Sequence, residues 1–400
     1  MSSNPAACLI IGGGIHGTML GIQILKSGTL RQHDLRIVDP NESLISRWKT
    51  NTTRIGMRYL RSPSVHHLDL DPFSLRKFSD DQDGTDFLGR YKRPSLELFH
   101  EHCQALIDET GLSDVHHQGS VTALTRDTDD LFCVTLASGE ILTAWRIIVA
   151  TGMNEALAWP EWAYDLKNAG GHVEHVFNDA ADVTTENEPP IVITGGGITA
   201  AHTALKLSIE YPGQVTLLTR HSLRTYDFDS DPGWLGPKYM NGFSQLKDNR
   251  QRRNTLKKAR YRGSVPPEIK RALASEVAKG HLHLCQDEVG GTTVDHGNML
   301  LHLQSRETIH ARTVILATGY RQECPMPDWL RVYGDAHELG FAPCGTPLVD
   351  QDLSWHGGIH LTGALAELEL GPTARNIAGA RQAVARIIPA LEPSPTLVHQ

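Results

Sequence analysis

The sequence predicts an α/β protein built from two Rossmann-like halves. Two glycine-rich loops lie about half a chain apart, and each one follows an apolar strand and leads into a helix. The first loop is Gly12-Gly13-Gly14-Ile15-His16-Gly17, and the second is Gly195-Gly196-Gly197-Ile198-Thr199-Ala200. One such loop is a weak signal, but here the supporting strand and helix occur twice. The pattern therefore indicates two dinucleotide-binding domains in one chain.

Three positions of each loop have a physical task. The first glycine permits a tight turn, the second lets the backbone approach a pyrophosphate, and the third small residue lets the helix pack closely on the strand. The helix N-terminus then presents free N–H groups and a positive dipole end to the phosphates. The candidate pyrophosphate contacts are therefore Gly12, Gly14, Gly17, Gly195, Gly197 and Ala200.

The first half begins with a βαβ unit. Residues 7–11 predict a buried strand, residues 15–27 a helix, and residues 35–39 a second parallel strand. Asp39 ends that strand, 22 residues after Gly17 (39 − 17). An acid at this position can accept both ribose hydroxyls of an adenosine. The alternative is a turn aspartate before Pro40.

The chain then continues with a loop-rich segment and further strands. Residues 43–86 predict a long irregular stretch, residues 94–110 an amphipathic helix, and residues 119–137 short strands with a turn at 138–139. A buried strand at 147–149 ends in Ala-Thr-Gly, and a strand at 314–316 ends in Ala-Thr-Gly-Tyr. This repeat predicts an internal duplication that brings five residues near the cofactors: Thr151, Gly152, Thr318, Gly319 and Tyr320.

The remaining segments set the expected domain boundaries. Residues 153–190 predict a connection between the two modules. Residues 222–265 predict an insertion, and we interpret its basic, helix-like run as a solvated face. A strand at 359–361 and a helix from about Pro372 to Ile388 return to the first half. We expect a discontinuous domain of residues 1–160 and 320–400, with a second domain, residues 161–319, inserted into it.

The two modules differ at the end of their second strand. The strand at 215–219 is followed by Arg220, 20 residues after Ala200 (220 − 200), where the first module has Asp39. A cation there suits a ribose 2′-phosphate, and Ser222 can add a hydrogen bond. We therefore assign NADPH to the second module. The first loop alone does not distinguish FAD from NAD, and its assignment to FAD rests on the duplication and the tail.

Composition excludes several classes of partner. The net charge of −8 and pI near 6.2 give no reason to expect nucleic acid or an anionic membrane. No apolar run approaches the roughly 18 residues of a membrane helix, and the N-terminus lacks the basic region of a signal peptide. Six cysteines without a CxxC pair, and histidines without an HExxH set, argue against a metal site and a dithiol reductase. We expect a cytoplasmic protein with reduced thiols, and leave homo-oligomerisation open.

The glycine loops, the Ala317-Thr318-Gly319-Tyr320 strand end and the insertion resemble the class B flavin monooxygenases, and within them the N-hydroxylating lysine and ornithine monooxygenases. Residues 48–68, which begin with Trp48, look like the segment that those enzymes place beside flavin and substrate. Asp229-Ser230-Asp231-Pro232 looks like part of their nicotinamide-domain insertion. The resemblance covers most of the chain, and it implies FAD in the first domain and NADPH in the second.

Three positions depart from the family pattern. Arg61 falls where the family has a flavin-contacting Gln, and His66 falls where it has a Lys that grips the amino-acid carboxylate. Gly233-Trp234-Leu235-Gly236 replaces an Asn-Glu pair. Arg61 and His66 are therefore our candidate catalytic residues, with ordinary loop positions as the alternative. The departures leave the substrate unspecified.

The resemblance implies a monooxygenase in which NADPH reduces FAD, a C4a-(hydro)peroxyflavin forms with O2, and one oxygen atom passes to a small molecule. An amine nitrogen is the favoured acceptor. In the tail, Gly363 and a helix N-terminus near Gly371 and Pro372 would face the flavin and stabilise negative charge at its N1; the alternative is a simple Pro-initiated helix. Two other functions stay open: an FAD-dependent NAD(P)H reductase or oxidase without oxygen insertion, and a regulatory FAD/NAD(P)-binding protein.

Overall fold

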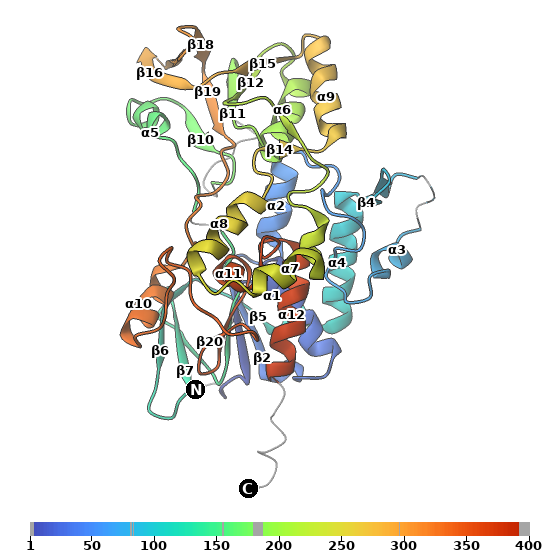
Figure 1. The fold of residues 1–400 in the computed structure, drawn as a ribbon, viewed down its shortest axis with the longest axis vertical. Coiled ribbons are helices and arrows are strands. Elements are labelled where there is room, and N and C mark those ends of the chain that lie inside the picture. Colours follow the sequence, from blue (N-terminus) through green and yellow to red (C-terminus); the bar gives the residue numbers. More distant parts are fainter. Residues whose placement is uncertain are drawn as a thin grey trace.

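The computed structural model describes residues 4–80, 82, 84–153, 156–178, 187–295 and 297–391. Two mainly parallel sheets lie at opposite ends of the long axis, with the insertion (residues 222–265) and part of the tail (residues 320–391) between them (Figure 1). Short, fully buried and mainly apolar strands lie at the centre of both sheets, at Cys8–Ile11 and Ile147–Val149 in one and at Ile191–Thr194 and Thr313–Leu316 in the other. This suits parallel strands that are covered on both faces. The predicted α/β class with two Rossmann-like halves is confirmed.

The first sheet has the strand order β20-β21-β9-β1-β2-β5. Its strands are β1 (Cys8–Ile11), β2 (Leu35–Asp39), β5 (His116–Gln118), β9 (Ile147–Val149), β20 (Ser354–His356) and β21 (Ile359–Leu361). β21 lies parallel to β9, with Ile359 opposite Ile147. The predicted return of the tail to the first half is therefore confirmed.

The second sheet has the order β10-β19-β11-β12-β15, and all its pairs are parallel. Its strands are β10 (Val173–His175), β11 (Ile191–Thr194), β12 (Val215–Thr219), β15 (Leu282–Gln286) and β19 (Thr313–Leu316). The interpretation of residues 153–190 as a mere connection is wrong, because this stretch supplies the edge strand β10 and the helix α5 (Glu161–Asn168). Its buried apolar side chains join the core of the second sheet.

Helices cover both sheets. α1 (Ile15–Lys26), α4 (Leu96–Thr110) and α12 (Ile377–Leu391) belong to the first half, and α6 (Ile198–Glu210) and α9 (Pro267–Ala278) to the second. The helix predicted at 94–110 is confirmed: Ser95 caps the N-terminus of α4 by accepting from the Leu98 N–H, and Gly111 ends it in a left-handed conformation. α12 begins at Ile377 rather than Pro372, because residues 371–376 form turns.

Each half also carries a small antiparallel sheet, which lies in the chain between β5 and β9 in the first half and between β15 and β19 in the second. These are β6 (Val121–Arg126), β7 (Phe132–Leu136) and β8 (Ile141–Ala144) in the first half, and β16 (Val289–Asp295), β17 (Asn298–Leu303) and β18 (Thr308–Ala311) in the second. The predicted internal duplication is thus present in the fold.

The segment 43–86, expected to be irregular, contains two helices, α2 (Ser46–Arg54) and α3 (Ser74–Phe78). α2 joins the halves: Arg54 Nη1 donates to the Val176 and Asn178 carbonyls, and Lys206 Nζ donates to the Arg54 carbonyl. A hairpin of β3 (Phe87–Leu88) and β4 (Arg93–Pro94) follows. Short 3-10 turns lie at Gln32–Asp34, Leu112–Val115, Pro232–Leu235 and Gly363–Ala366.

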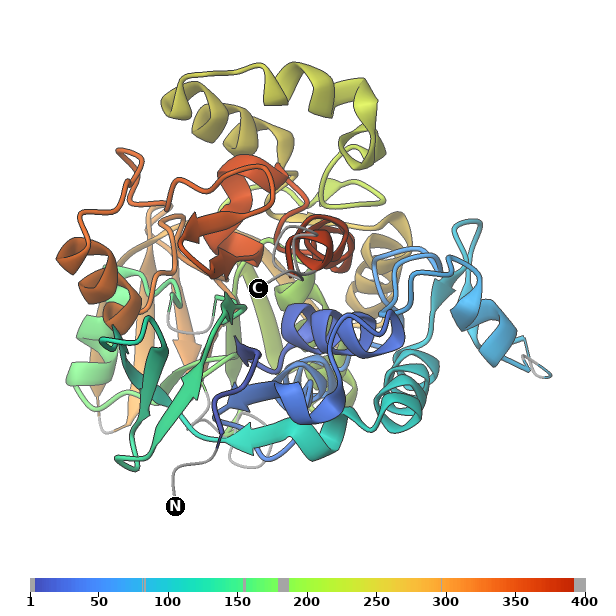
Figure 2. The ribbon, with the colours of Figure 1, turned by 90° about the horizontal axis from the view of Figure 1, so that it is seen from below.

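The helices of the insertion pack on the tail, whereas Leu223 and Val265 at its two ends belong to the core of the second sheet. It holds β13 (Arg224–Thr225), α7 (Pro237–Ser244), α8 (Asn249–Ala259) and β14 (Ser264–Val265), and the tail holds α10 (Asp328–Ala336) and α11 (Glu367–Leu370). Phe243 and Leu256 of the insertion share a small core with Ala342 and Leu368 of the tail. Figure 2 shows the yellow-green insertion helices beside the red tail.

None of the helices that the structure describes is both long and apolar enough to cross a bilayer. The described histidine, cysteine and acidic side chains form no group of three or more that could hold a metal ion.

Candidate functional site

The first glycine loop is a backbone cradle at the carboxyl end of the first sheet. Gly12 has φ +111°, and a Cβ there would lie 2.5 Å from the Ala150 carbonyl oxygen. A Cβ at Gly17 would lie 1.8 Å from the Gly12 oxygen. At Gly14, by contrast, an added Cβ would meet none of the described atoms within 4 Å. The open side of the loop is therefore at Gly14, where the prediction places the pyrophosphate.

The second glycine loop repeats this geometry. A Cβ at Gly195 would lie 2.4 Å from the Ala317 carbonyl oxygen, just as Gly12 meets Ala150. The Ala317 N–H donates to the Thr194 carbonyl, and the Ala150 N–H to the Ile11 carbonyl. Each Ala-Thr-Gly segment thus crosses directly beside its own glycine loop, as the duplication predicted.

Both loops lead into helices whose first N–H groups are left for a ligand. The N-caps of α1 and α6 are Gly14 and Gly197, and none of the described side chains caps either one. The first turns of these two helices also contain no acidic residue. Each N-terminus keeps its positive dipole end uncompensated, and this arrangement favours phosphate.

Asp39 closes the first loop from the side. Its Oδ2 accepts the Gly13 N–H at 2.6 Å, and its Oδ1 accepts from the Asn41 backbone and side chain at 2.9 and 2.6 Å. The carboxylate is therefore held in place beside the loop with lone pairs to spare. Its contact with a ribose stays a prediction.

Arg220 and Ser222 are exposed beside the second loop, directly after β12. The sequence reasoning missed a neighbour, His221, whose ring lies against the loop: a Cβ at Gly196 would come within 3.1 Å of its Cε1. Arg262 adds a second cation close enough to Arg220 for the two charges to interact. This cationic rim suits the predicted 2′-phosphate.

The residues after the two crossing strands differ in their partners. The buried Thr151 hydroxyl has no hydrogen-bond partner among the described residues, whereas Thr318 Oγ1 donates to the Ala158 carbonyl at 2.5 Å. Gly152 and Gly319 both have positive φ, +73° and +76°. Tyr320 stacks on Phe177 with ring centroids 5.8 Å apart. Thr151 is therefore the better placed of the two threonines to bind a ligand.

The tail meets the first glycine loop through His16. Its Nδ1 lies 2.9 Å from Thr362 Oγ1, and a Cβ at Gly363 would lie 3.8 Å from its ring. Burial lowers the pKa of His16 to about 4. Gly371 and Pro372 also contact the insertion: a Cβ at Gly371 would come within 2.8 Å of Met240 Sδ, and the Pro372 carbonyl accepts from Arg260 at 3.1 Å. Their place beside the flavin stays a prediction.

Arg61 fastens the segment after α2 to the insertion. Its guanidinium donates to the carbonyls of residues 226, 227, 228 and 264, at 2.8, 3.2, 2.6 and 3.4 Å, and to Ser264 Oγ. With its donors engaged by the protein, Arg61 is placed to position the insertion. A direct contact with flavin stays a prediction.

His66 and Trp48 lie in partly buried positions on the same segment. Burial, aided by the charge of Arg381, lowers the pKa of His66 to about 4, so its imidazole is neutral at pH 7. Trp48 packs against Phe99 at 5.0 Å and edge-on to His100 at 5.3 Å. The structure gives Trp48 a place in the first core, and its contact with a cofactor stays a prediction.

A buried charge cluster, which the sequence reasoning missed, holds the insertion on the tail. Glu367 is fully buried and pairs with Arg253, with Arg260 at 2.7 Å and with Arg375 at 2.8 Å. Burial would raise the pKa of Glu367, but these three guanidinium groups hold it at about 2. The interpretation of the basic run as a solvated face is therefore wrong for Arg253 and Arg260. It holds for Lys257 and Lys258, which are exposed.

These residues fit two dinucleotides. In both loops the first glycine, Gly12 or Gly195, leaves no room for a Cβ atom. Both loops also lead into helices that have no side-chain cap at the N-terminus. Several buried polar atoms near the loops and the tail also lack a partner among the described residues: His16 Nε2, Thr151 Oγ1, Thr194 Oγ1 and Thr373 Oγ1. Buried polar atoms are rarely left unpaired, so they indicate space built for polar ligands.

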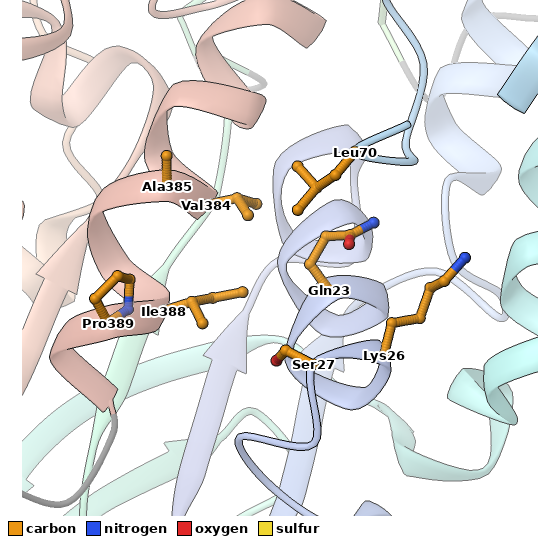
Figure 3. Close-up of a pocket in the computed structure, with 8 residues that line it drawn as sticks. All are labelled: Gln23, Lys26, Ser27, Leu70, Val384, Ala385, Ile388 and Pro389. Carbon is orange, nitrogen blue, oxygen red and sulfur yellow. The ribbon is translucent and has the colours of Figure 1, made fainter. Parts of the chain in front are cut away.

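A separate pocket of about 360 Å³ lies between α1 and α12 (Figure 3). It is lined by Gln23, Lys26, Ser27, Leu70, Val384, Ala385, Ile388 and Pro389. The lining residues that α1 supplies, Gln23 and Lys26, come from its C-terminal half, whereas the glycine loop is at the other end of that helix. The pocket is therefore not part of the dinucleotide sites.

Comparisons with known proteins agree with this geometry. Residues 9–262, more than half of the chain, match the family model of pyridine nucleotide-disulphide oxidoreductases. No curated protein has a sequence that matches significantly. Among solved structures, the ornithine hydroxylase from Pseudomonas aeruginosa is 19% identical with a TM-score of 0.76, over 97% of this chain and 98% of that chain.

Two further structures have the same fold over their whole length. The FAD-bound cadaverine monooxygenase of the desferrioxamine pathway from Erwinia amylovora is 16% identical, with a TM-score of 0.73 over 100% of this chain and 98% of that chain. The ornithine N-hydroxylase from Kutzneria, solved with reduced FAD, NADP⁺ and L-ornithine, is 15% identical, with a TM-score of 0.74 over 97% and 99%. The chain therefore belongs to the pyridine nucleotide-disulphide oxidoreductase family, with the fold of the N-hydroxylating flavin monooxygenases.

Proposed function

We propose that this chain is an NADPH- and FAD-dependent monooxygenase that oxygenates a small molecule at an amine nitrogen. One observation carries the proposal: two glycine loops of the same geometry, each open at an uncapped helix N-terminus, occur in one chain. The shared fold with N-hydroxylating enzymes supports the choice of reaction. We propose the domains as residues 1–160 with 320–400, and 161–319 with the insertion at 222–265. Residues 1–3, 154–155, 179–186 and 392–400 of these ranges are among those that lie outside the described chain.

The first loop is the proposed FAD site. Gly12, Gly14 and Gly17 would admit the pyrophosphate, and Asp39 would accept the ribose hydroxyls. Thr151 and the tail at Gly363 would line the flavin side, where His16 offers a neutral imidazole. Bound there, FAD would supply the electron transfer to O2 that no side chain can perform.

The second loop is the proposed NADPH site. Gly195, Gly197 and Ala200 form the cradle, and Arg220, with Ser222, would hold the 2′-phosphate. The neighbouring guanidinium of Arg262 supports a dianionic ligand. Both coenzymes would therefore be held by the backbone of one chain.

The segment between the halves is the proposed substrate side. His66 is neutral at pH 7 and half-buried, so it can donate or accept a hydrogen bond without adding charge. An amine must be unprotonated to act as a nucleophile, and a neutral, partly dry surface disfavours its ammonium form. Arg61 keeps the insertion closed over this side.

The test measures where the electrons of NADPH go. The purified protein is loaded with FAD and mixed with NADPH under anaerobic conditions, and the visible absorbance of the flavin is recorded. Air and a panel of amines are then added, and NADPH consumption, H2O2 and hydroxylated product are measured together. We expect bleaching by NADPH and product formed at the expense of H2O2 with at least one amine.

Two outcomes would contradict the proposal. Full recovery of electrons as H2O2 with every amine would indicate an oxidase, and a flavin that NADPH does not bleach would indicate a regulatory binding protein. A cytoplasmic location and assembly into a homo-oligomer stay predictions.

A further inference from the structure

Cys344 lies at the tip of a tight turn in the tail. The Gly345 N–H donates to the Ala342 carbonyl at 2.8 Å, and the Ala342 N–H donates to the Thr346 carbonyl at 2.8 Å. Gly345 has φ +74°, which lets the chain reverse directly after the cysteine. The Cys344 side chain is only partly buried, so small reagents can reach its sulfur.

Two polar side chains contact the Cys344 sulfur. Arg253 Nη2 donates to it at 3.3 Å, and Thr346 Oγ1 lies 3.4 Å away. The same guanidinium pairs with the buried Glu367 through Nη1 and with Thr346 through Nη2. A fixed guanidinium beside a sulfur stabilises the thiolate, which is the nucleophilic form of cysteine.

A second thiol is near the same hydroxyl. Cys324 also hydrogen-bonds the Thr346 side chain, so both sulfur atoms lie close to one oxygen atom. Cys324 packs against the core of the first half, whereas Cys344 packs against the small core shared with the insertion. The two thiols therefore meet where the tail and the insertion are joined.

The six cysteines of the chain are not equivalent. Burial raises the pKa of Cys8 to about 12 and of Cys324 to about 11, and it also raises the pKa of Cys103, Cys133 and Cys285. For Cys344, burial is outweighed by the hydrogen bonds from Thr346 and Arg253, and its pKa is lowered. Cys344 is the one thiol in which geometry and charge both favour reaction at neutral pH.

We propose that Cys344 is a site of reversible oxidation by hydrogen peroxide, with Cys324 as its resolving thiol. The Cys344 thiolate attacks one oxygen of H2O2, the O–O bond breaks, and hydroxide leaves and takes up a proton to become water. The product is a sulfenic acid. Cys324 then attacks this sulfur, the S–O bond breaks, and a second water leaves as the disulfide forms. Two thiols and one H2O2 thus give one disulfide and two waters.

Oxidation changes the sulfur atom that Arg253 contacts. Arg253 is tied to Glu367, and Glu367 to Arg260 and Arg375, so the change reaches the Pro372 turn through Arg260. The proposal goes beyond the proposed function and does not depend on it, because hydrogen peroxide is supplied from outside.

The test compares three serine variants with the unmodified chain. Full-length protein is treated with H2O2, with and without dimedone to trap sulfenic acid, and digested peptides are identified by mass spectrometry. The unmodified chain and the control Cys285→Ser are expected to form the 324–344 disulfide, reversed by dithiothreitol. Cys324→Ser is expected to stop at a dimedone adduct on Cys344, and Cys344→Ser to form neither product.

A kinetic measurement on the unmodified chain keeps the test independent of the variants. The rate of iodoacetamide alkylation is followed against pH for each peptide, and Cys344 is expected to react at least tenfold faster than Cys285 at pH 7. Equal rates, or first oxidation at another cysteine, would overturn the proposal. A sulfenic acid on Cys344 that persists without disulfide formation would overturn the role of Cys324.

Discussion

Gly12 and Gly14 are required for different physical reasons. At Gly12 the backbone has φ +111° and a Cβ would collide with the Ala150 carbonyl, whereas Gly14 has φ −74° and open space around it. The first glycine therefore serves the fold, and the second serves the ligand that approaches it.

Alanine variants separate these two roles. Gly12→Ala is expected to lower the free energy of unfolding by about 2 kcal/mol or more, from positive-φ strain and the clash, and to lose flavin. Gly14→Ala is expected to keep the stability of the apoprotein and to lose only flavin affinity. Thermal unfolding with and without FAD, together with flavin content, distinguishes them. An equal loss of stability in the apoproteins would refute the distinction.

Arg220 is exposed beside the second loop, so its replacement has little structural cost. Arg220→Ala is expected to raise the KM for NADPH about tenfold or more, since a charge-assisted phosphate contact is worth roughly 1.5–3 kcal/mol, and to leave the KM for NADH nearly unchanged. Flavin reduction assayed with both coenzymes measures this. Arg271→Ala, an exposed arginine of α9, is the matched control, and an unchanged NADPH preference in Arg220→Ala would refute the assignment.

Which residues sequence reasoning could find depends on how far apart their partners are. The glycine loops, Asp39 and the Ala-Thr-Gly segments are local patterns whose contacts follow from strand, turn and helix. The burial of Arg253 could not be found in this way, because its carboxylate partner, Glu367, lies 114 residues later and is brought close only by the tertiary fold. The contact between His16 and Thr362 could not be found in this way either, because the two residues are 346 positions apart.

At the scale of elements, the fold depends on segments that connect the two halves. α2, the guanidinium of Arg61 and the Glu367 cluster each connect residues of one half to residues of the other. Amphipathic helices such as α4 were predictable because their apolar spacing and caps are local. α5 and β10 were not, because a three-residue edge strand carries too little periodicity to be seen.

The hydrogen bonds of the Arg61 guanidinium give a prediction at this scale. A lysine offers one nitrogen and cannot bond four carbonyls at once, so Arg61→Lys is expected to speed amide exchange at residues 226–228 and 264 and to cost about 1–2 kcal/mol of stability. The absorbance spectrum of bound flavin is expected to stay unchanged. Arg58→Lys, at an exposed position of the same segment, is the control. A shifted flavin spectrum with unchanged exchange would instead support a direct contact of Arg61 with flavin.

At the scale of the whole molecule, buried histidines set the response to acid. Among the described residues, burial lowers the pKa of six histidines to about 4: His16, His66, His100, His102, His175 and His202. The unfolded chain takes up protons below about pH 6.5, whereas these folded sites stay neutral until about pH 4. Stability is therefore expected to fall as the pH drops through this window.

His202 isolates one contribution, because burial alone lowers its pKa. His202→Leu is expected to reduce the loss of stability between pH 7 and pH 5 by about 2 kcal/mol, as measured by urea unfolding at both values. His33→Asn, at a site with 71% of the side chain exposed, is expected to leave the profile unchanged. Parallel profiles for His202→Leu and the unmodified chain would rule out this account.

The late position of β21 has a consequence for synthesis on the ribosome. Its partner β9 ends at Val149, and β21 begins at Ile359, 210 positions later (359 − 149). A nascent chain whose second half has already emerged still has an unpaired strand edge at β9. The buried side chains of α7 and α8 also lack their partners from the tail until Ala342 and Leu368 emerge. Such edges pair readily with other chains, so we expect the nascent chain to bind a chaperone during translation.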